Sequence, residues 1–312
     1  MRLFFTKLIF FFLFSCIFYI TMICFWGTVI PKKLQFNILY DIGAYGHINT
    51  RLKEVEKTKD IDILFLGSSH AYRGFDTRLF RKEGLTSFNL GSSSQTPIQT
   101  ELLLERYLKQ LNPKVIIFDV YASSFCSDGI ESTIDIISNS TIDFDSMIMS
   151  LKVKNLKVIN TFIFSLFQDL FHQKDKFTEN KIIGKDTYIK GGFVERKLEF
   201  FHQKKNELSN KSIEKKDWKF NEDQFLAFER IVKQAKKNGI KVFLVHSPYT
   251  SQLYNSKSNN NEFDKRIEKY AKYYNFNKDS VFNDSLDFYD RDHLNQNGVV
   301  KYNKLLMEIL EL

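Results

Sequence analysis

The sequence predicts an α/β protein: a three-layer α/β/α sandwich with a mostly parallel, five-stranded, flavodoxin-like sheet, preceded by one transmembrane helix. Three observations lead to this prediction. Short apolar runs typical of buried strands alternate with amphipathic stretches typical of helices. Strands separated by helices pair in parallel, with helices covering both faces of the sheet. A long apolar stretch precedes this alternation.

The apolar stretch at the N-terminus has the length of a membrane span. No charged residue occurs from Leu8 to Ile30, and a helix of that length measures about 34 Å, enough to cross the hydrocarbon of a bilayer. A cleaved signal peptide is the alternative, but the stretch is long and no small-x-small cleavage site ends it. We therefore expect residues 1–33 to be an uncleaved anchor.

Charges on the two sides of the span give only a weak orientation signal. Arg2 and Lys7 precede it, and Lys32 and Lys33 follow it, so the positive-inside bias is small. A short tail followed by one span and a large domain usually leaves the domain outside the cytoplasm. We expect a cytoplasmic N-terminus and a periplasmic or extracellular domain.

Composition excludes some functions. The net charge of +8 comes from lysines interspersed with acidic residues, which is typical of solvated helix faces and does not indicate a nucleic-acid partner. Cys16 and Cys24 lie in the span and Cys126 is the one remaining cysteine, so a disulfide framework within the soluble part is excluded.

A polar connector is expected from 34 to 59, with a short helix around Asn49 to Lys57. The soluble domain is then expected from 60 to 312. Five short apolar runs are its expected strands: Asp62–Leu66, Ser87–Leu90, Val115–Val120, Ile240–Val245 and Ser280–Phe282.

Helices are expected between and after these strands. Asp76 and Thr77 are capping residues for a short helix ending near Gly84, and Pro97 lies in the first turn of the next one. Helical spacing of apolar residues supports the longer helices. The expected helices span 76–84, 96–111, 224–237, 262–274 and 296–310.

Residues 125–215 interrupt the alternation of strands and helices. This segment is long, rich in Phe and Lys, and expected to be helical in part between Ser146 and Phe171, with a turn at Gly191-Gly192. We interpret it as an insertion over the sheet. Its phenylalanines are expected to form a buried helix face.

Gly67-Ser68-Ser69-His70 follows the first expected strand. Ligands of parallel sheets gather at the carboxyl ends of the strands. A serine placed there at a helix N-terminus has backbone N–H groups turned toward the same space, so an oxyanion can be held beside its hydroxyl. Turns after strands are rich in Gly and Ser for backbone reasons alone, so this motif needs a partner.

That partner is the stretch YDRDHLNQNG at 289–298, just before the last helix. His293 follows Asp290 by three residues, which lets the carboxylate reach Nδ1 and leaves Nε2 free to take a hydroxyl proton. Helix capping by Asp290 and Asp292 is the alternative. Asp292 is the rival acid, but as the neighbour of His293 it would have to fold back sharply to meet Nδ1.

Together the two stretches resemble the SGNH, or GDSL-like, hydrolase superfamily over roughly residues 60–122 and 218–310. The resemblance implies the same sandwich, with Ser69 as nucleophile, His293 as base and Asp290 as its acid. It also implies an oxyanion hole formed by the backbone N–H groups of Ser69 and Gly91, where Gly91 belongs to the NLGSSS stretch. Ser68 occupies the position that is Asp in the family.

One block of the family is missing. A Gly-x-Asn-Asp motif should follow the third strand, but the chain reads FDVYASSF. Tyr121, Ser123 or Ser124 is a substitute for the missing donor, or two backbone N–H groups form the hole alone. Loss of one donor costs about a hundredfold or more in rate.

Other residues are weaker candidates for the substrate pocket. His70 and Arg73 flank the nucleophile, Tyr121 and Ser123 follow the third strand, and His246 follows the fourth. The remaining histidines show no metal-ligand spacing and the chain has no Cys pair for zinc. No P-loop or GxGxxG is present, so we expect no metal and no cofactor.

The pattern is most similar to membrane-anchored SGNH proteins of cell-envelope acyl transfer, of the teichoic acid D-alanylation and alginate O-acetylation type. That resemblance implies a serine esterase or O-acyltransferase that acts on acyl groups of envelope glycans through an acyl-serine intermediate. A membrane-bound O-acyltransferase is the implied partner. The alternative is a non-catalytic scaffold with this fold that docks onto such an acyltransferase.

Overall fold

The computed structural model describes residues 1–202, 215–278 and 281–312. Its centre is a five-stranded parallel sheet with the order β2-β1-β3-β7-β8. Counted in chain order, these strands run 2-1-3-4-5, a doubly wound arrangement. The strands are β1 (Ile63–Leu66), β2 (Ser87–Asn89), β3 (Val115–Asp119), β7 (Lys241–His246) and β8 (Lys272–Asn275).

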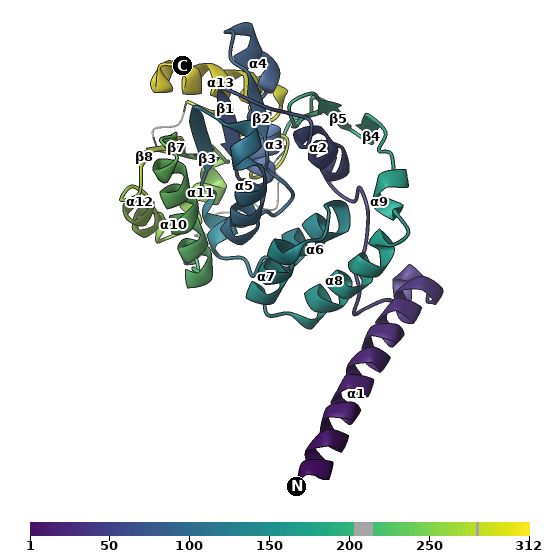
Figure 1. Ribbon diagram of the computed structural model, residues 1–312. Helices are drawn as coiled ribbons and strands as arrows, with labels where there is room; N and C mark the ends of the chain where they lie inside the picture. The colour runs from purple at the N-terminus through teal and green to yellow at the C-terminus, as the bar shows by residue number, and fades with distance from the viewer. Residues whose placement is uncertain (203–214, 279–280) are drawn as a thin grey trace.

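Helices cover both faces of the sheet, as Figure 1 shows. Side chains alternate between the faces along each strand, so Leu64 and Ile116 join the core beneath α5 (Pro97–Leu111) and α10 (Glu222–Lys237). Phe65 and Ile117 join the opposite core, which α3 (Ser69–Gly74) and α13 (Gln296–Leu310) complete. The expected α/β/α sandwich is confirmed.

Several helices begin where the sequence predicts because their caps are local. Thr96 and Gln99 form a reciprocal capping box at the start of α5, and the Asn295 side chain accepts from the Gly298 N–H at the start of α13. The other helices of the sandwich and connector are α2 (Ile48–Val55), α4 (Thr77–Lys82), η2 (Ala122–Phe125), α11 (Ser251–Asn255) and α12 (Asn260–Ile267).

The fifth strand differs from the prediction. Residues 281–282 are not in a strand, and Ser280 lies outside the described residues. The strand is β8, which was expected to be the end of a helix; that helix, α12, ends at Ile267. β8 lies at the edge of the sheet with mostly half-buried side chains, so it lacks the apolar run that marks a buried strand.

The insertion contains helices and a small separate sheet. Its helices are α6 (Ile130–Asn139), α7 (Phe144–Lys152), α8 (Leu156–Asp169) and α9 (Gln173–Lys176), and its antiparallel strands are β4 (Ile182–Ile183), β5 (Asp186–Ile189) and β6 (Phe193–Arg196). Gly191 and Gly192 form the turn between β5 and β6 with φ of 92° and 86°, values that favour glycine. The expected turn is confirmed.

The N-terminal helix α1 (Arg2–Val29) is followed by the short η1 (Lys32–Leu34). Among the described residues, it is the one helix long and apolar enough to cross a membrane. It is not isolated, because Tyr19 Oη donates to Asn160 Oδ1 of α8 at 2.6 Å and Phe164 packs so closely on Gly27 that a Cβ there would overlap its ring. Figure 1 shows α1 leaving the domain beside α8. Length and composition fit either an anchor or a signal sequence.

Candidate active site

A sharp turn at the end of β1 positions Ser69. Gly67 has φ of +141°, and a Cβ there would meet Asp119 at 3.0 Å, so this close backbone approach requires glycine. The side chain of Ser68 caps α3 by accepting from the His70 N–H. Ser69 is therefore the first residue of α3, at the carboxyl edge of the sheet.

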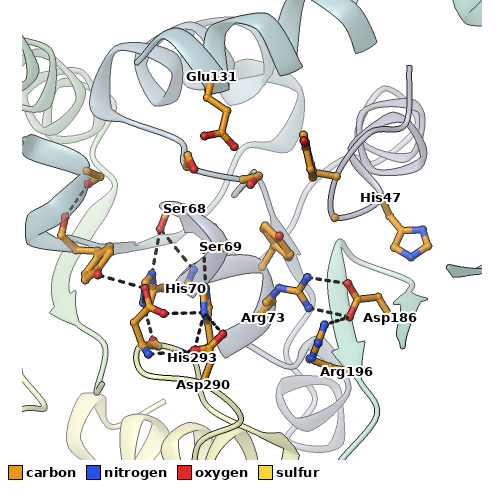
Figure 2. Close-up of a pocket in the computed structure, with 18 of the residues that line it drawn as sticks. His47, Ser68, Ser69, His70, Arg73, Glu131, Asp186, Arg196, Asp290 and His293 are labelled. Atoms are coloured by element: carbon orange, nitrogen blue, oxygen red, sulfur yellow. Dashed lines mark hydrogen bonds and ion pairs between the residues drawn. The ribbon is translucent and has the colours of Figure 1, made fainter. Parts of the chain in front are cut away.

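His293 reaches Ser69 from the loop before α13. Ser69 Oγ lies 2.8 Å from His293 Nε2, and His293 Nδ1 lies 3.1 Å from each carboxylate oxygen of Asp290. Figure 2 shows the three side chains in a line at one side of the pocket. The structure thus brings together the three residues that the sequence predicts as a triad, in the order that proton transfer needs.

Asp292, the rival acid that was expected to need a sharp fold back, does contact the same histidine. Its Oδ1 lies 3.2 Å from His293 Nδ1, and its Oδ2 accepts from Tyr121 Oη at 3.3 Å. The loop folds back because Asp290 Oδ1 accepts from the backbone N–H groups of Asp292 and His293, at 3.0 and 2.8 Å. His293 therefore faces two carboxylates.

These two carboxylates set the charge state of His293. Burial lowers the pKa of His293, but Asp290 and Asp292 together outweigh it and raise the pKa to about 9. The contact with His293 in turn holds the pKa of Asp292 below its usual range, although burial alone would raise it. The imidazolium form of His293 is thus the favoured one near neutral pH.

His70 supports the loop that carries His293. Its ring is stacked on that of His293, with centroids 4.7 Å apart. Its Nε2 lies 2.7 Å from the backbone oxygen of Asp292, and its Nδ1 lies 3.3 Å from Ser68 Oγ. Burial and the neighbouring His293 lower the pKa of His70 to about 4. A neutral His70 that donates to the carbonyl and accepts from Ser68 fits both contacts.

The expected oxyanion hole is only partly available. Ser69 is the first residue of its helix, so its N–H has no acceptor in a preceding turn. The Gly91 N–H, however, donates to Asn89 Oδ1 at 3.0 Å, and Gly91 does not line the pocket. Its predicted role needs correction, because the side chain that ends β2 already accepts that proton.

Ser93 and Ser94, unlike Gly91, belong to the lining of the pocket beside Ser69. Ser94 adopts a left-handed conformation with φ of 49°. In the described part of the chain, neither of their backbone N–H groups has a hydrogen-bond acceptor. Sequence reasoning missed them, although the three serines after β2 were a visible signal.

The pocket beside Ser69 has a volume of about 600 Å³. Of the further candidates, His70, Arg73, Tyr121 and Ser123 line it. His246 does not: it is 1 % exposed, and its Nδ1 lies 3.3 Å from Tyr273 Oη. Its place at the end of β7 is at the correct edge, but its side chain turns into the core.

The far side of the pocket comes from segments that the sequence did not connect with the site. The connector contributes Gly43 to His47, α6 contributes Glu131, and the small sheet contributes Ile183, Asp186 and Arg196. Arg73 of α3 donates to both oxygens of Asp186 at 3.0 and 2.7 Å, so this ion pair joins the insertion to the helix that carries Ser69 (Figure 2).

One set of groups in the described chain has the spacing of metal ligands. Atoms of His70, Asp292 and His293 lie within 4.8 Å of one another. His70 Nε2 already faces the Asp292 carbonyl, and His293 Nε2 faces Ser69. Both nitrogens are therefore engaged in hydrogen bonds, which fits proton transfer better than metal binding.

No protein-family model matches the sequence, and the curated proteins give no match. Among solved structures, a GDSL-like lipase from Bacteroides thetaiotaomicron is similar with a TM-score of 0.46 and 13% identity, covering 85% of this chain and 98% of its own. A protein assigned as an acylhydrolase from Bacteroides fragilis gives a TM-score of 0.42 and 11% identity, covering 86% and 97%. At such low identities and TM-scores, neither similarity identifies the reaction.

Proposed function

We propose that the protein is a membrane-anchored serine esterase or O-acyltransferase of the SGNH type, which moves acyl groups of cell-envelope glycans through an acyl-Ser69 intermediate. One observation carries this proposal. Ser69 Oγ, the imidazole of His293 and the Asp290 carboxylate are linked by contacts of 2.8 and 3.1 Å at the edge of a pocket of about 600 Å³.

The first half-reaction forms the acyl-enzyme. His293 Nε2 takes the Ser69 proton as Oγ attacks the ester carbonyl, and Asp290 stabilises the imidazolium through Nδ1. The tetrahedral intermediate collapses when the imidazolium gives that proton to the leaving alkoxide. The alcohol departs and the acyl group stays on Ser69 Oγ.

The second half-reaction returns the enzyme to its starting state. Water or a glycan hydroxyl gives its proton to His293 and attacks acyl-Ser69, and the imidazolium then protonates Ser69 Oγ as the new acid or ester leaves. The N–H groups of Ser69, Ser93 and Ser94 are the donors we assign to the oxyanion in both steps.

Three features of the structure support a glycan substrate and an anchored enzyme. The pocket lining is rich in hydroxyl groups, which suit a polyhydroxylated ligand: Tyr45, Ser93, Ser94, Ser123, Ser124 and Ser127. The pocket is large enough for a sugar unit. The packing of α1 on α8, including the Tyr19–Asn160 hydrogen bond, favours a retained helix over a cleaved signal.

The test combines a fluorophosphonate probe with p-nitrophenyl acetate, using the full chain in detergent. We expect probe labelling and ester turnover in the unaltered chain, and a loss of about 10³-fold or more in turnover in Ser69→Ala and His293→Ala. Ser285→Ala, at an exposed residue that does not line the pocket, is the control and should keep both. Labelling that persists in Ser69→Ala would reject the assigned nucleophile.

A non-catalytic scaffold that docks onto a membrane-bound O-acyltransferase is the second candidate. Two observations favour it: the Gly91 N–H is engaged by Asn89, and the raised pKa of His293 leaves little neutral base near pH 7. If the unaltered chain shows no labelling up to alkaline pH but co-purifies with such an acyltransferase, this candidate replaces the enzyme.

A further inference from the structure

The segment of α1 that is free of the domain is too short to cross a bilayer. Tyr19 is hydrogen-bonded to Asn160 of α8, and Ile23 and Phe164 share a buried cluster. The part of α1 that precedes Tyr19, Arg2–Phe18, measures about 26 Å as a helix. The hydrocarbon of a bilayer is about 30 Å thick, so the segment beside α8 has to supply the remainder.

The end of α8 that lies beside this segment points toward the membrane. Asn160 is bonded to Tyr19, and Phe164, one turn further along α8, packs on Gly27, further along α1. The two helices therefore run in the same direction, as Figure 1 shows. Because each rises 1.5 Å per residue, Leu156 at the start of α8 lies at about the level of Ser15.

The surface at this end of the insertion is apolar and exposed. Phe144, Ile148 and Leu151 recur at helical spacing on the outer face of α7, and they are 69%, 36% and 53% exposed. Leu156 begins α8 and is 76% exposed. The inner face of α7 carries the buried Ser146, Met149 and Ser150. This polarity is the reverse of that of a helix facing water.

Charged groups around this surface fit the headgroup level of a bilayer. Lys152 pairs with Glu101 at 2.8 Å and Lys154 contacts Asp223 at 3.5 Å, so both ammonium groups are directed to the domain. Long lysine stems keep their charge in the polar layer while their methylene groups contact lipid. Asp145 lies in the first turn of α7 and limits the depth of that end.

We propose that the α7–α8 ridge, formed by Phe144, Ile148, Leu151 and Leu156, inserts into the membrane beside α1, at the boundary between headgroups and acyl chains. The ridge and α1 are then two attachments of one domain, and together they fix its orientation on the bilayer. This proposal rests on the anchor in the proposed function and is independent of the proposed chemistry.

The experiment uses the full chain in vesicles of phosphatidylcholine and phosphatidylglycerol. Cys16, Cys24 and Cys126 are replaced by Ser, and a nitroxide is attached to a single new cysteine in L151C or L156C. L226C on α10 is the matched control, because Leu226 is 52% exposed and Leu151 53%. Collision of each nitroxide with oxygen, which concentrates in lipid, is compared with collision with a water-soluble nickel chelate.

We expect several-fold more oxygen than nickel collision in L151C and L156C, and the reverse in L226C. Equal exposure to nickel in all three variants would overturn the proposal. L13C in α1 distinguishes failure of the ridge from failure of the anchor. Lipid contact in L13C together with water contact in L151C and L156C rejects insertion of the ridge alone. Water contact in L13C rejects both the membrane anchor and the insertion of the ridge. Thermal unfolding of each labelled variant verifies that the fold is kept.

Discussion

The two walls of the pocket are built in different ways. The sheet wall carries Ser69, just after β1, and His293, in the loop before α13. Each is positioned by hydrogen bonds within its own short turn, and the Ser69–His293 contact joins the two turns. The outer wall comes from the connector and the insertion and is joined to the sheet wall by the Arg73–Asp186 pair. Under the proposed function, we assign the chemistry to the sheet wall and the selection of the substrate to the outer wall.

Asp290→Asn should disrupt the Ser69–His293–Asp290 triad on the sheet wall and have the largest effect on activity. It removes the charge that stabilises the His293 imidazolium, and we expect kcat for p-nitrophenyl acetate to fall by about 10²- to 10⁴-fold. Initial rates under saturating ester measure this. Asp284→Asn, whose carboxylate instead binds the Ser251 N–H and hydroxyl, is the control. Unchanged kcat in Asp290→Asn would make Asp292 the acid.

The pH dependence of kcat/KM distinguishes the roles of Asp290 and Asp292. His293 acts as a base only when neutral, and because its pKa is raised to about 9, kcat/KM should rise with pH up to that value. Asp292→Asn removes one of the carboxylates that raise the pKa, so the midpoint should move to lower pH. Activity at pH 7 should then increase severalfold.

A pH–rate profile of the unaltered chain and of Asp292→Asn tests this prediction. The profile of kcat/KM reports the groups that titrate in the free enzyme. Asp290→Asn serves as the comparison, because it should lose activity at every pH. An acid limb with the same midpoint in the unaltered chain and in Asp292→Asn would contradict the proposed influence of Asp292.

Asp186→Asn should weaken substrate binding at the outer wall and leave the chemical step at the sheet wall unchanged. It weakens the bidentate contact with Arg73 and the 3.2 Å contact with Arg196, so we expect KM for an acylated oligosaccharide to rise by about tenfold, corresponding to about 1.4 kcal/mol. Turnover of p-nitrophenyl acetate, which is too small to contact this wall, should stay within about twofold. An equal loss with both substrates would show that the two walls do not separate.

His246→Gln should have the smallest effect on activity. The side chain is buried beside Tyr273 and does not line the pocket, so kcat/KM should stay within about twofold while the free energy of unfolding falls by about 1–3 kcal/mol. Urea unfolding and ester turnover measure the two quantities. A large loss of kcat/KM without a loss of stability would place His246 in the site.

Part of this fold could be predicted because its signals are local. The apolar run of β1, the capping box of α5 and the Asn295 cap of α13 are each contained within a few residues. β8 could not be predicted in the same way, since its side chains are half-buried at the sheet edge and its sequence continues the helical pattern before it. Whether a strand is fully buried, and not its local propensity, therefore decides whether its sequence shows a recognisable strand pattern.

The sequence by itself determined that a serine and an Asp-x-x-His motif would meet. Alternation of strands and helices makes the sheet parallel, and the carboxyl ends of parallel strands share one edge. Only the tertiary structure decided that Asp292 also reaches His293, that Asn89 engages the Gly91 N–H, and that the insertion closes the pocket. Those contacts depend on how loops fold back and on segments far apart in the chain, which leave no periodic trace in the sequence.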